Sequence, residues 1–203
     1  MRLGRLHLRV TTRSPEALRD RFDAAACFAC LGELVHALAG HQWMVVAGLV
    51  EPLLRGGFSR AHSDVDIAVP LAHLDGVARA AVAVGYVMTT RLMRSKLPHD
   101  RNLELHLRLQ PGGPMLELRP RRLRLWRLDA RGEFDEKRFP PYVDVFPFVA
   151  DDKELRILDG GWRLPLGLPI VRAARLADGV EVPVVDPSYV QALRVLRTQT
   201  ARS

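Results

Sequence analysis

The spacing of apolar residues along the first fifty positions predicts a helix followed by a strand. Between Ser14 and Gly40, apolar residues recur at the three- and four-residue intervals of a helix, with Ser14 placed as N-cap and Pro15 at the first helical position. The run WMVVAG at 43–48 is short, continuous and rich in β-branched residues. Such a run is typical of a buried strand.

The same helix and strand patterns alternate once more before residue 90. LVEPLLRGG at 49–57 predicts a short helix that ends at two glycines. DVDIAVP at 64–70 predicts a strand that stops at its proline, and LAHLDGVARAAVAVGY at 71–86 predicts a second amphipathic helix. The first half therefore has the helix and strand content of an α/β protein.

From residue 102 the pattern changes to strict alternation. NLELHLRLQPGGPMLELRP at 102–120 predicts an antiparallel hairpin that turns at its PGG sequence. One face is expected to be dry and the other solvated. The predicted dry face carries Leu103, Leu105, Leu107 and Leu109, and the solvated face carries Glu104, His106 and Arg108.

The remaining segments predict a further strand, a hairpin and a closing helix. The strand lies around 142–148, the hairpin turns at Asp178 and Gly179, and the helix begins near Pro187. We expect one α/β (α+β) domain over 1–203, with a small mixed sheet and helices mostly on one side. Its core covers about 14–150 and a hairpin-plus-helix element about 151–203.

Composition narrows the possible environments of this 203-residue chain, which is 48% hydrophobic. The sequence contains no run of about 18 uncharged apolar residues, so we do not expect a membrane span. Its N-terminal part does not resemble a secretory signal. Cys27 and Cys30 lie in a predicted helix without further cysteines, so we interpret them as ordinary buried residues of a protein in a reducing compartment. The expected location is the cytoplasm.

The net charge of +7 comes largely from arginine and favours phosphate-bearing partners, or else a solvated surface. Basic residues are densest in RPRRLRLWRL at 119–128, where they alternate with leucines. No nucleic-acid-binding motif accompanies this stretch, so we do not expect direct nucleic-acid binding. We interpret it as a solvated strand face or a phosphate-contacting edge.

Asp64 and Asp66 are the first candidate functional residues. Residues i and i+2 of a strand point to the same side, so these two carboxylates lie together while Val65 faces the other way. Two adjacent negative charges repel each other, and a cation bound between them offsets this repulsion. Mg²⁺, or Mn²⁺, is the expected cofactor because such ions bind one or two carboxylates together with substrate phosphates.

Four blocks of the sequence are RGGF at 55–58, DVD at 64–66, YVDVFPF at 142–148 and DGVEVPVVDPSYVQAL at 178–193. Together they resemble the LicD-like, fukutin-related phosphotransferase family of the nucleotidyltransferase superfamily. The resemblance covers about 31–194. It implies a nucleotidyltransferase-type mixed sheet with flanking helices, and it assigns Asp144 as the third carboxylate of a catalytic metal site with Asp64 and Asp66.

The resemblance implies transfer of a phosphocholine-like phospho-alcohol from a CDP-alcohol donor to a glycan hydroxyl, as in polysaccharide modification. Arg60, Ala61, His62 and Ser63 stand where the family is more acidic, and RAHSDVDIAV is also similar to the strand of aminoglycoside-type nucleotidyltransferases. The alternative function is therefore nucleotidyl transfer from an NTP to a small hydroxylated acceptor. A further alternative is an inactive binding protein on the same fold.

Several residues near the acids are candidates for contacts with the donor phosphates or nucleotide. The helix start at Gly48 offers backbone N–H groups to anions, and His62 is a weaker candidate for substrate binding or proton transfer. Glu104 and Glu117 are alternative third ligands if the strand order differs, and Asp151 and Asp152 are assigned to a turn. The donor-binding candidates are Gly48, Arg55, Gly57, Arg60 and Ser63.

Overall fold

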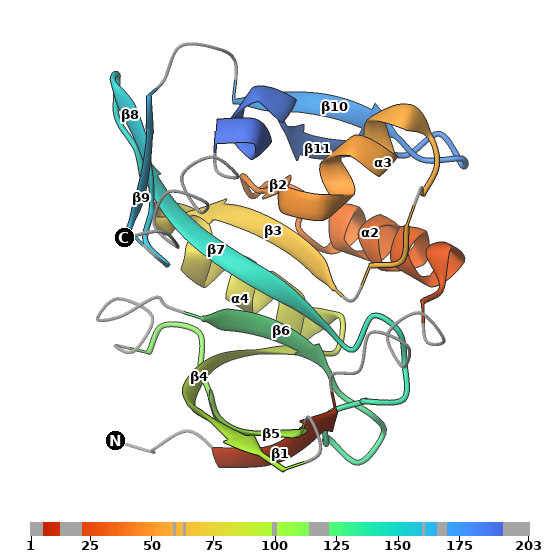
Figure 1. Ribbon diagram of the computed structural model, residues 1–203, viewed down its shortest axis with the longest axis vertical. Helices are drawn as coiled ribbons and strands as arrows, with labels where there is room; N and C mark the ends of the chain where they lie inside the picture. The colour runs from red at the N-terminus through yellow and green to blue at the C-terminus, as the bar shows by residue number, and fades with distance from the viewer. Residues whose placement is uncertain are drawn as a thin grey trace.

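The protein has a mixed α+β fold, seen in a computed structural model that describes residues 6–12, 22–58, 60–62, 64–98, 101–113, 122–159, 161–165 and 170–192 (Figure 1). The helices are α2 (Ala24–Ala37), η1 (Ala47–Leu49), α3 (Val50–Arg55), η2 (Leu71–His73) and α4 (Leu74–Ala83), and residues 187–192 are also helical. The strands are β1 (Leu6–Thr12), β2 (Met44–Val45), β3 (Val65–Pro70), β4 (Tyr86–Leu97), β5 (Arg101–Arg108), β6 (Leu123–Arg127), β7 (Tyr142–Ala150), β8 (Glu154–Ile157), β9 (Trp162–Pro165), β10 (Val171–Arg175) and β11 (Glu181–Val185).

One sheet joins all 11 strands of the described residues, so it is larger than the small sheet that we predicted. Its main path is β1-β5-β4-β6-β7-β3-β2-β11-β10, and β8 and β9 branch from β7. The pairs β3–β7 and β2–β11 are parallel, and the other pairs are antiparallel. The C-terminal hairpin turns near Asp178 and Gly179 as predicted, and it extends the main sheet through β2.

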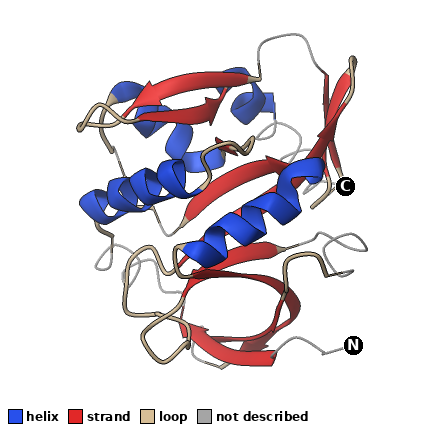
Figure 2. Cartoon of the chain, turned by 180° about the vertical axis from the view of Figure 1, so that it is seen from behind, coloured by secondary structure: helices blue, strands red, loops and turns tan. Residues whose placement is uncertain are grey.

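Helices α2 and α4 cover one face of this sheet (Figure 2). The apolar positions predicted for the second helix are Leu71, Leu74, Val77, Ala78 and Ala81. The last four lie in α4 and are buried, whereas Leu71 lies in η2 and is only partly buried. They join a core that includes Val65 and Ile67 of β3, both fully buried. No helix within the described residues has the length and apolar character needed to span a bilayer.

The predicted first helix and first strand are longer than the observed elements. The helix α2 begins at Ala24, because the Asp23 side chain accepts a hydrogen bond from the Ala26 N–H and caps it. Ser14 and Pro15 lie outside the described residues. The paired part of the predicted strand is limited to Met44 and Val45, since the chain turns into η1 at Ala47, where φ is 59°.

The alternating segment 101–108 forms strand β5, but its two faces are the reverse of our prediction. Glu104 and His106 are 2% and 0% exposed, whereas Leu103, Leu105 and Leu107 are only partly buried. Leu109, just beyond the strand, is buried as predicted. The strand pairs with β4 and β1, and residues 114–120 of the predicted hairpin lie outside the described residues.

The reversal at β5 follows from the shape of the sheet. The end formed by β1, β5 and β4 curls, as the lower part of Figure 1 shows. Inside this end a second cluster of Trp126, Phe134 and Tyr142 packs beside His106. Strand alternation predicts two faces but cannot tell which one the tertiary fold encloses.

Within the described part of the basic stretch, Leu123–Arg127 form the largely buried central strand β6 and not a solvated face, which corrects our interpretation of these residues. Arg124 is 4% exposed and bonds to the carboxylates of Glu104 and Asp144. Arg127 donates to Glu33 of α2 at 2.7 Å. Residues 119–121 lie outside the described residues. Part of the positive charge is therefore neutralised inside the protein.

Cys27 and Cys30 are buried, free residues of α2, as expected for ordinary helix positions. Burial raises the pKa of Cys27 to about 12 and that of Cys30 to about 11. Both thiols therefore stay protonated near neutral pH, and neither has the reactivity of a thiolate.

Adjacent positions of α2 allow a matched test of this core. Leu31→Ala is expected to lower the free energy of unfolding by about 2–5 kcal/mol, because Leu31 is fully buried. Gly32→Ala is expected to raise it by about 0.5–1 kcal/mol, because an added Cβ meets nothing within 4 Å and alanine favours a helix. Urea unfolding measures both, and equal effects would contradict the packing described.

Candidate metal centre

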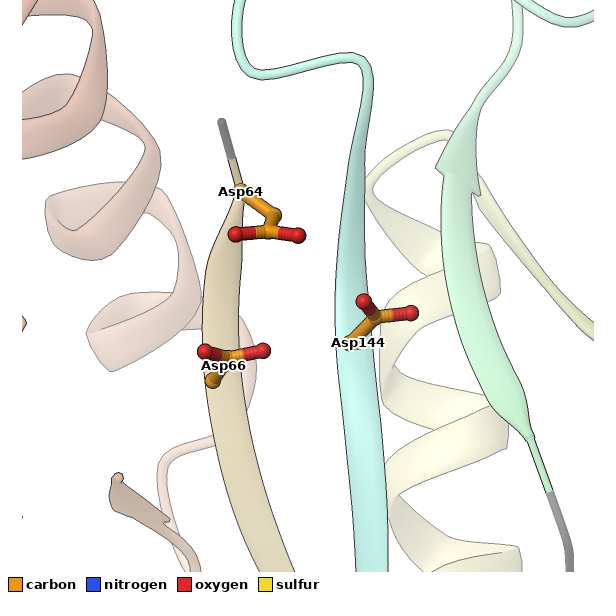
Figure 3. A group of neighbouring side chains, drawn as sticks. All are labelled: Asp64, Asp66 and Asp144. Carbon is orange, nitrogen blue, oxygen red and sulfur yellow. The ribbon is translucent and has the colours of Figure 1, made fainter. Parts of the chain in front are cut away.

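Asp64, Asp66 and Asp144 come together as the sequence predicted. One carboxylate oxygen from each lies within 4.8 Å of the others. Figure 3 shows Asp66 and Asp144 on neighbouring strands, with Asp64 immediately before β3. All three side chains are partly buried.

The parallel pairing of β3 with β7 creates this arrangement. Asp66 and Asp144 are direct register partners, so their side chains lie side by side on one face of the sheet. The alternate residues Val65 and Val143 face the helix-covered core, where they are 0% and 1% exposed. The buried valines thus fix the direction of the aspartates.

The three oxygens have the spacing and chemistry that a divalent cation requires. Two oxygens bound to one Mg²⁺ lie at most about 4.2 Å apart, twice a bond of about 2.1 Å. The observed envelope of 4.8 Å is therefore within a small side-chain movement of coordination. Carboxylate oxygens are hard donors that suit Mg²⁺ and Mn²⁺. Asp64, Asp66 and Asp144 would hold the ion.

Asp144 has a second neighbour on the opposite side of β7. Arg124 is its register partner on β6, and the Arg124 Nε–H donates to Asp144 Oδ1 at 2.7 Å. Burial raises the pKa of the Asp144 carboxyl, and the Arg124 guanidinium opposes that rise. The carboxylate thus lies between a cation of the protein and the two other aspartates.

Glu104 does not join the carboxylate triad, although we considered it as an alternative third ligand. It bonds instead to Arg124 Nη1 and Arg91 Nη1, each at 3.0 Å. The sequence pattern did not predict that Arg124 bonds to Asp144 and Glu104, because Arg124 lies in a stretch with many arginines. Glu117 lies outside the described residues.

Opposing influences act on the two buried groups of β5. Burial favours the neutral form of Glu104, but the hydrogen bond with His106 and the charges of Arg124 and Arg91 outweigh it. The pKa of Glu104 is consequently lowered far below its ordinary value. Burial also lowers the pKa of His106, which keeps that ring neutral near pH 7.

Gly48 lies beneath the side chains of the segment that precedes the acids. A Cβ on Gly48 would be 3.1 Å from the His62 ring and 3.2 Å from Arg60 Nη2. His62 is 7% exposed and packs on Phe58. A side chain here would thus require His62 and Arg60 to shift by a few tenths of an ångström. The predicted contact of Gly48 with donor phosphate stays a prediction.

The other predicted donor-binding residues differ in their surroundings. Arg55 is exposed and pairs with Glu51 within α3 at 2.8 Å. Gly56 has a φ of 71° and ends α3, as predicted, and Gly57 next to it is exposed. Ser63 lies outside the described residues. The donor roles of Arg55, Gly57, Arg60 and Ser63 stay predictions.

Two other features lie apart from the triad. A cavity of about 630 Å³ is found at the opposite end of β3, where Pro70 and Leu71 line it with Trp43. Asp151 accepts hydrogen bonds from the N–H groups of Lys153 and Glu154, which confirms its assignment to a turn.

Comparison with known proteins yields one distant structural similarity. No protein-family model matches the chain, and no curated protein matches it significantly. The crystal structure of lincosamide antibiotic adenylyltransferase LnuA with lincomycin bound is similar, at a TM-score of 0.47 and 14% identity over 84% of this chain and 85% of that chain. A likeness at this level assigns no activity to the protein.

The contact of Gly48 with the segment before the acids can be tested by adding one methyl group. Gly48→Ala is expected to lower the free energy of unfolding by about 1–3 kcal/mol, because the buried His62 ring has little room to move. The control is Gly57→Ala, where nothing lies within 4 Å of an added Cβ. Chemical denaturation should separate the variants, and an unchanged Gly48→Ala protein would show that His62 moves freely.

Proposed function

We propose that the protein catalyses divalent-metal-dependent transfer of a nucleotidyl group from a nucleoside triphosphate to a hydroxyl group of a small molecule. The observation that supports this proposal is the convergence of Asp64, Asp66 and Asp144 within 4.8 Å on one face of the sheet. These three side chains would hold a divalent ion, which would neutralise the charge that develops on the transferred phosphoryl group.

The three aspartates would hold the cation that binds the donor phosphates, since carboxylates alone would repel them. Asp66 and Asp144 are fixed by strand pairing, so their positions require little rearrangement when the donor binds. In the proposed reaction the acceptor oxygen forms a bond to the α-phosphorus in line with the bond that breaks to pyrophosphate. The proton of the acceptor hydroxyl passes to water as this bond forms.

Arg60 supports the choice of a nucleoside triphosphate as donor. Its guanidinium lies over Gly48, in the segment that leads to Asp64, where the LicD-like pattern is more acidic. A cationic side chain favours the highly negative triphosphate. The same side chain would repel the cationic headgroup of a CDP-choline donor.

Phospho-alcohol transfer from a CDP-alcohol to a glycan hydroxyl is the second candidate. The RGGF block at 55–58 and the YVDVFPF strand favour it, because these blocks resemble the LicD-like family. Both candidates use the same three carboxylates and differ in the fragment transferred.

Removing the paired acids tests the metal site. The double variant Asp64→Asn, Asp66→Asn is expected to weaken Mn²⁺ binding by more than about 100-fold, beyond the usual cost of losing an outer-shell partner. Asp152→Asn, at an exposed turn position, should bind Mn²⁺ like the parent. Isothermal titration measures each affinity, and retained binding in the double variant would refute this site.

Product analysis distinguishes the two donors. The protein is incubated with Mg²⁺, a panel of hydroxylated small molecules and glycans, and either the four NTPs or CDP-choline. Mass spectrometry is expected to find a nucleoside monophosphate adduct with release of pyrophosphate. A phosphocholine adduct would favour the second candidate, and the absence of any adduct would count against both.

A further inference from the structure

We propose that Glu104, acting through Arg124, positions Asp144 for the divalent metal. The inference rests on the proposed metal function of the triad and adds two positioning residues to it. Glu104 itself bonds to Arg124 and not to the aspartates. Its influence on the ion is therefore indirect, through the side chain that holds Asp144.

Polar side chains on β3, β7 and β6 lie in one row across the sheet, and the last of them reaches past β4 to β5. Asp66 on β3 is the register partner of Asp144 on β7, which is the register partner of Arg124 on β6. Arg124 then reaches across to Glu104 on β5, with Nε–H bonded to Asp144 and Nη1–H bonded to Glu104. One guanidinium thus connects the metal site to the buried glutamate.

Arg124 is held from several sides and has little freedom to move. Its guanidinium carbon lies 3.9 Å from the centroid of the Tyr142 ring, and its side chain is 5% exposed. The bond to Asp144 Oδ1 fixes the rotation of that carboxylate and uses one lone pair of that oxygen. The carboxylate therefore faces Asp64 and Asp66 in a defined orientation before an ion arrives.

Glu104 is the anion that three arginines share at the end of this row. It accepts from Arg91 and Arg124 at 3.0 Å and lies 3.8 Å from Arg9 Nη1, and Arg9 also pairs with Glu136 at 2.8 Å. The three cations are Arg9, Arg91 and Arg124, and the three anions are Glu104, Glu136 and Asp144.

Removing the charge of Glu104 has two effects on a bound cation, and both act in the same direction. One positive charge becomes uncompensated close to the ion, which repels it. Arg124 also loses the partner that holds Nη1, so Asp144 is less firmly oriented. Since neither effect favours binding, Glu104→Gln is expected to weaken the metal.

Glu33 of α2 offers a control, because it pairs with Arg127 on the opposite face of β6 from Arg124. It accepts hydrogen bonds from Arg127 of β6 and from Arg138, just as Glu104 bonds two arginines. Arg127, however, faces α2 rather than the aspartates. Glu33→Gln therefore removes a glutamate that two arginines share without changing the groups that contact Asp144. Glu33 is more exposed than Glu104, at 33% against 2%.

The test is Mn²⁺ titration, by electron paramagnetic resonance of the free ion, of the parent, Glu104→Gln and Glu33→Gln. Glu104→Gln is expected to lower Mn²⁺ affinity by about 10–100-fold, the usual cost of losing an outer-shell partner. Glu33→Gln should match the parent. Equal affinity of a folded Glu104→Gln protein and the parent would overturn the proposal, as would equal weakening by the control.

A second variant keeps the test decisive if Glu104→Gln does not fold. Arg124→Lys retains the positive charge but lacks the planar fork that bonds to Glu104 and Asp144 together, so it should also weaken Mn²⁺ binding at least about tenfold. Unchanged affinity in this variant would refute the positioning role. A parent protein that binds no Mn²⁺ would instead refute the proposed metal function itself.

Discussion

The repulsion among three neighbouring carboxylates is the constraint on which the candidate site depends. Parallel pairing of β3 with β7 places Asp66 beside Asp144, and Asp64 approaches them from the residue before β3. The cost of bringing these charges together has to be met by cations. On one side the protein supplies Arg124, which bonds to Asp144. On the other side, the three carboxylates lie close enough together to suit a divalent ion.

The same constraint accounts for the unusual interior of the curled end of the sheet. Arg124 is too deeply buried to be solvated, so its charge also needs Glu104. Glu104 in turn also forms ion pairs with Arg9 and Arg91. Each buried charge is thus compensated by another, and the chain of pairs begins at the proposed metal site. The exposed apolar side chains of β1 lie on the outer face of this curl.

Local sequence patterns were sufficient for the elements that are governed by local geometry. The glycine end of α3, the buried face of α4 and the same-side placement of Asp64 and Asp66 all follow from backbone conformation and side-chain periodicity. Asp144 was identified through a resemblance in the YVDVFPF block, and the structure brings it to the other two acids.

What the sequence by itself determined is therefore the presence of β3, β5, β7 and the β10–β11 hairpin, and which side chains share a face within a strand. It did not predict β1, β4, β8 or β9. The tertiary structure decided which face is enclosed. Leucines alternate with Glu104 and His106 along β5, and only the curl of the sheet made the polar side the buried one. Arg124 likewise resembled a solvated arginine until β6 was seen between β4 and β7. Periodicity fixes relative orientation within a strand, whereas burial and ion pairing depend on strands that are distant in sequence.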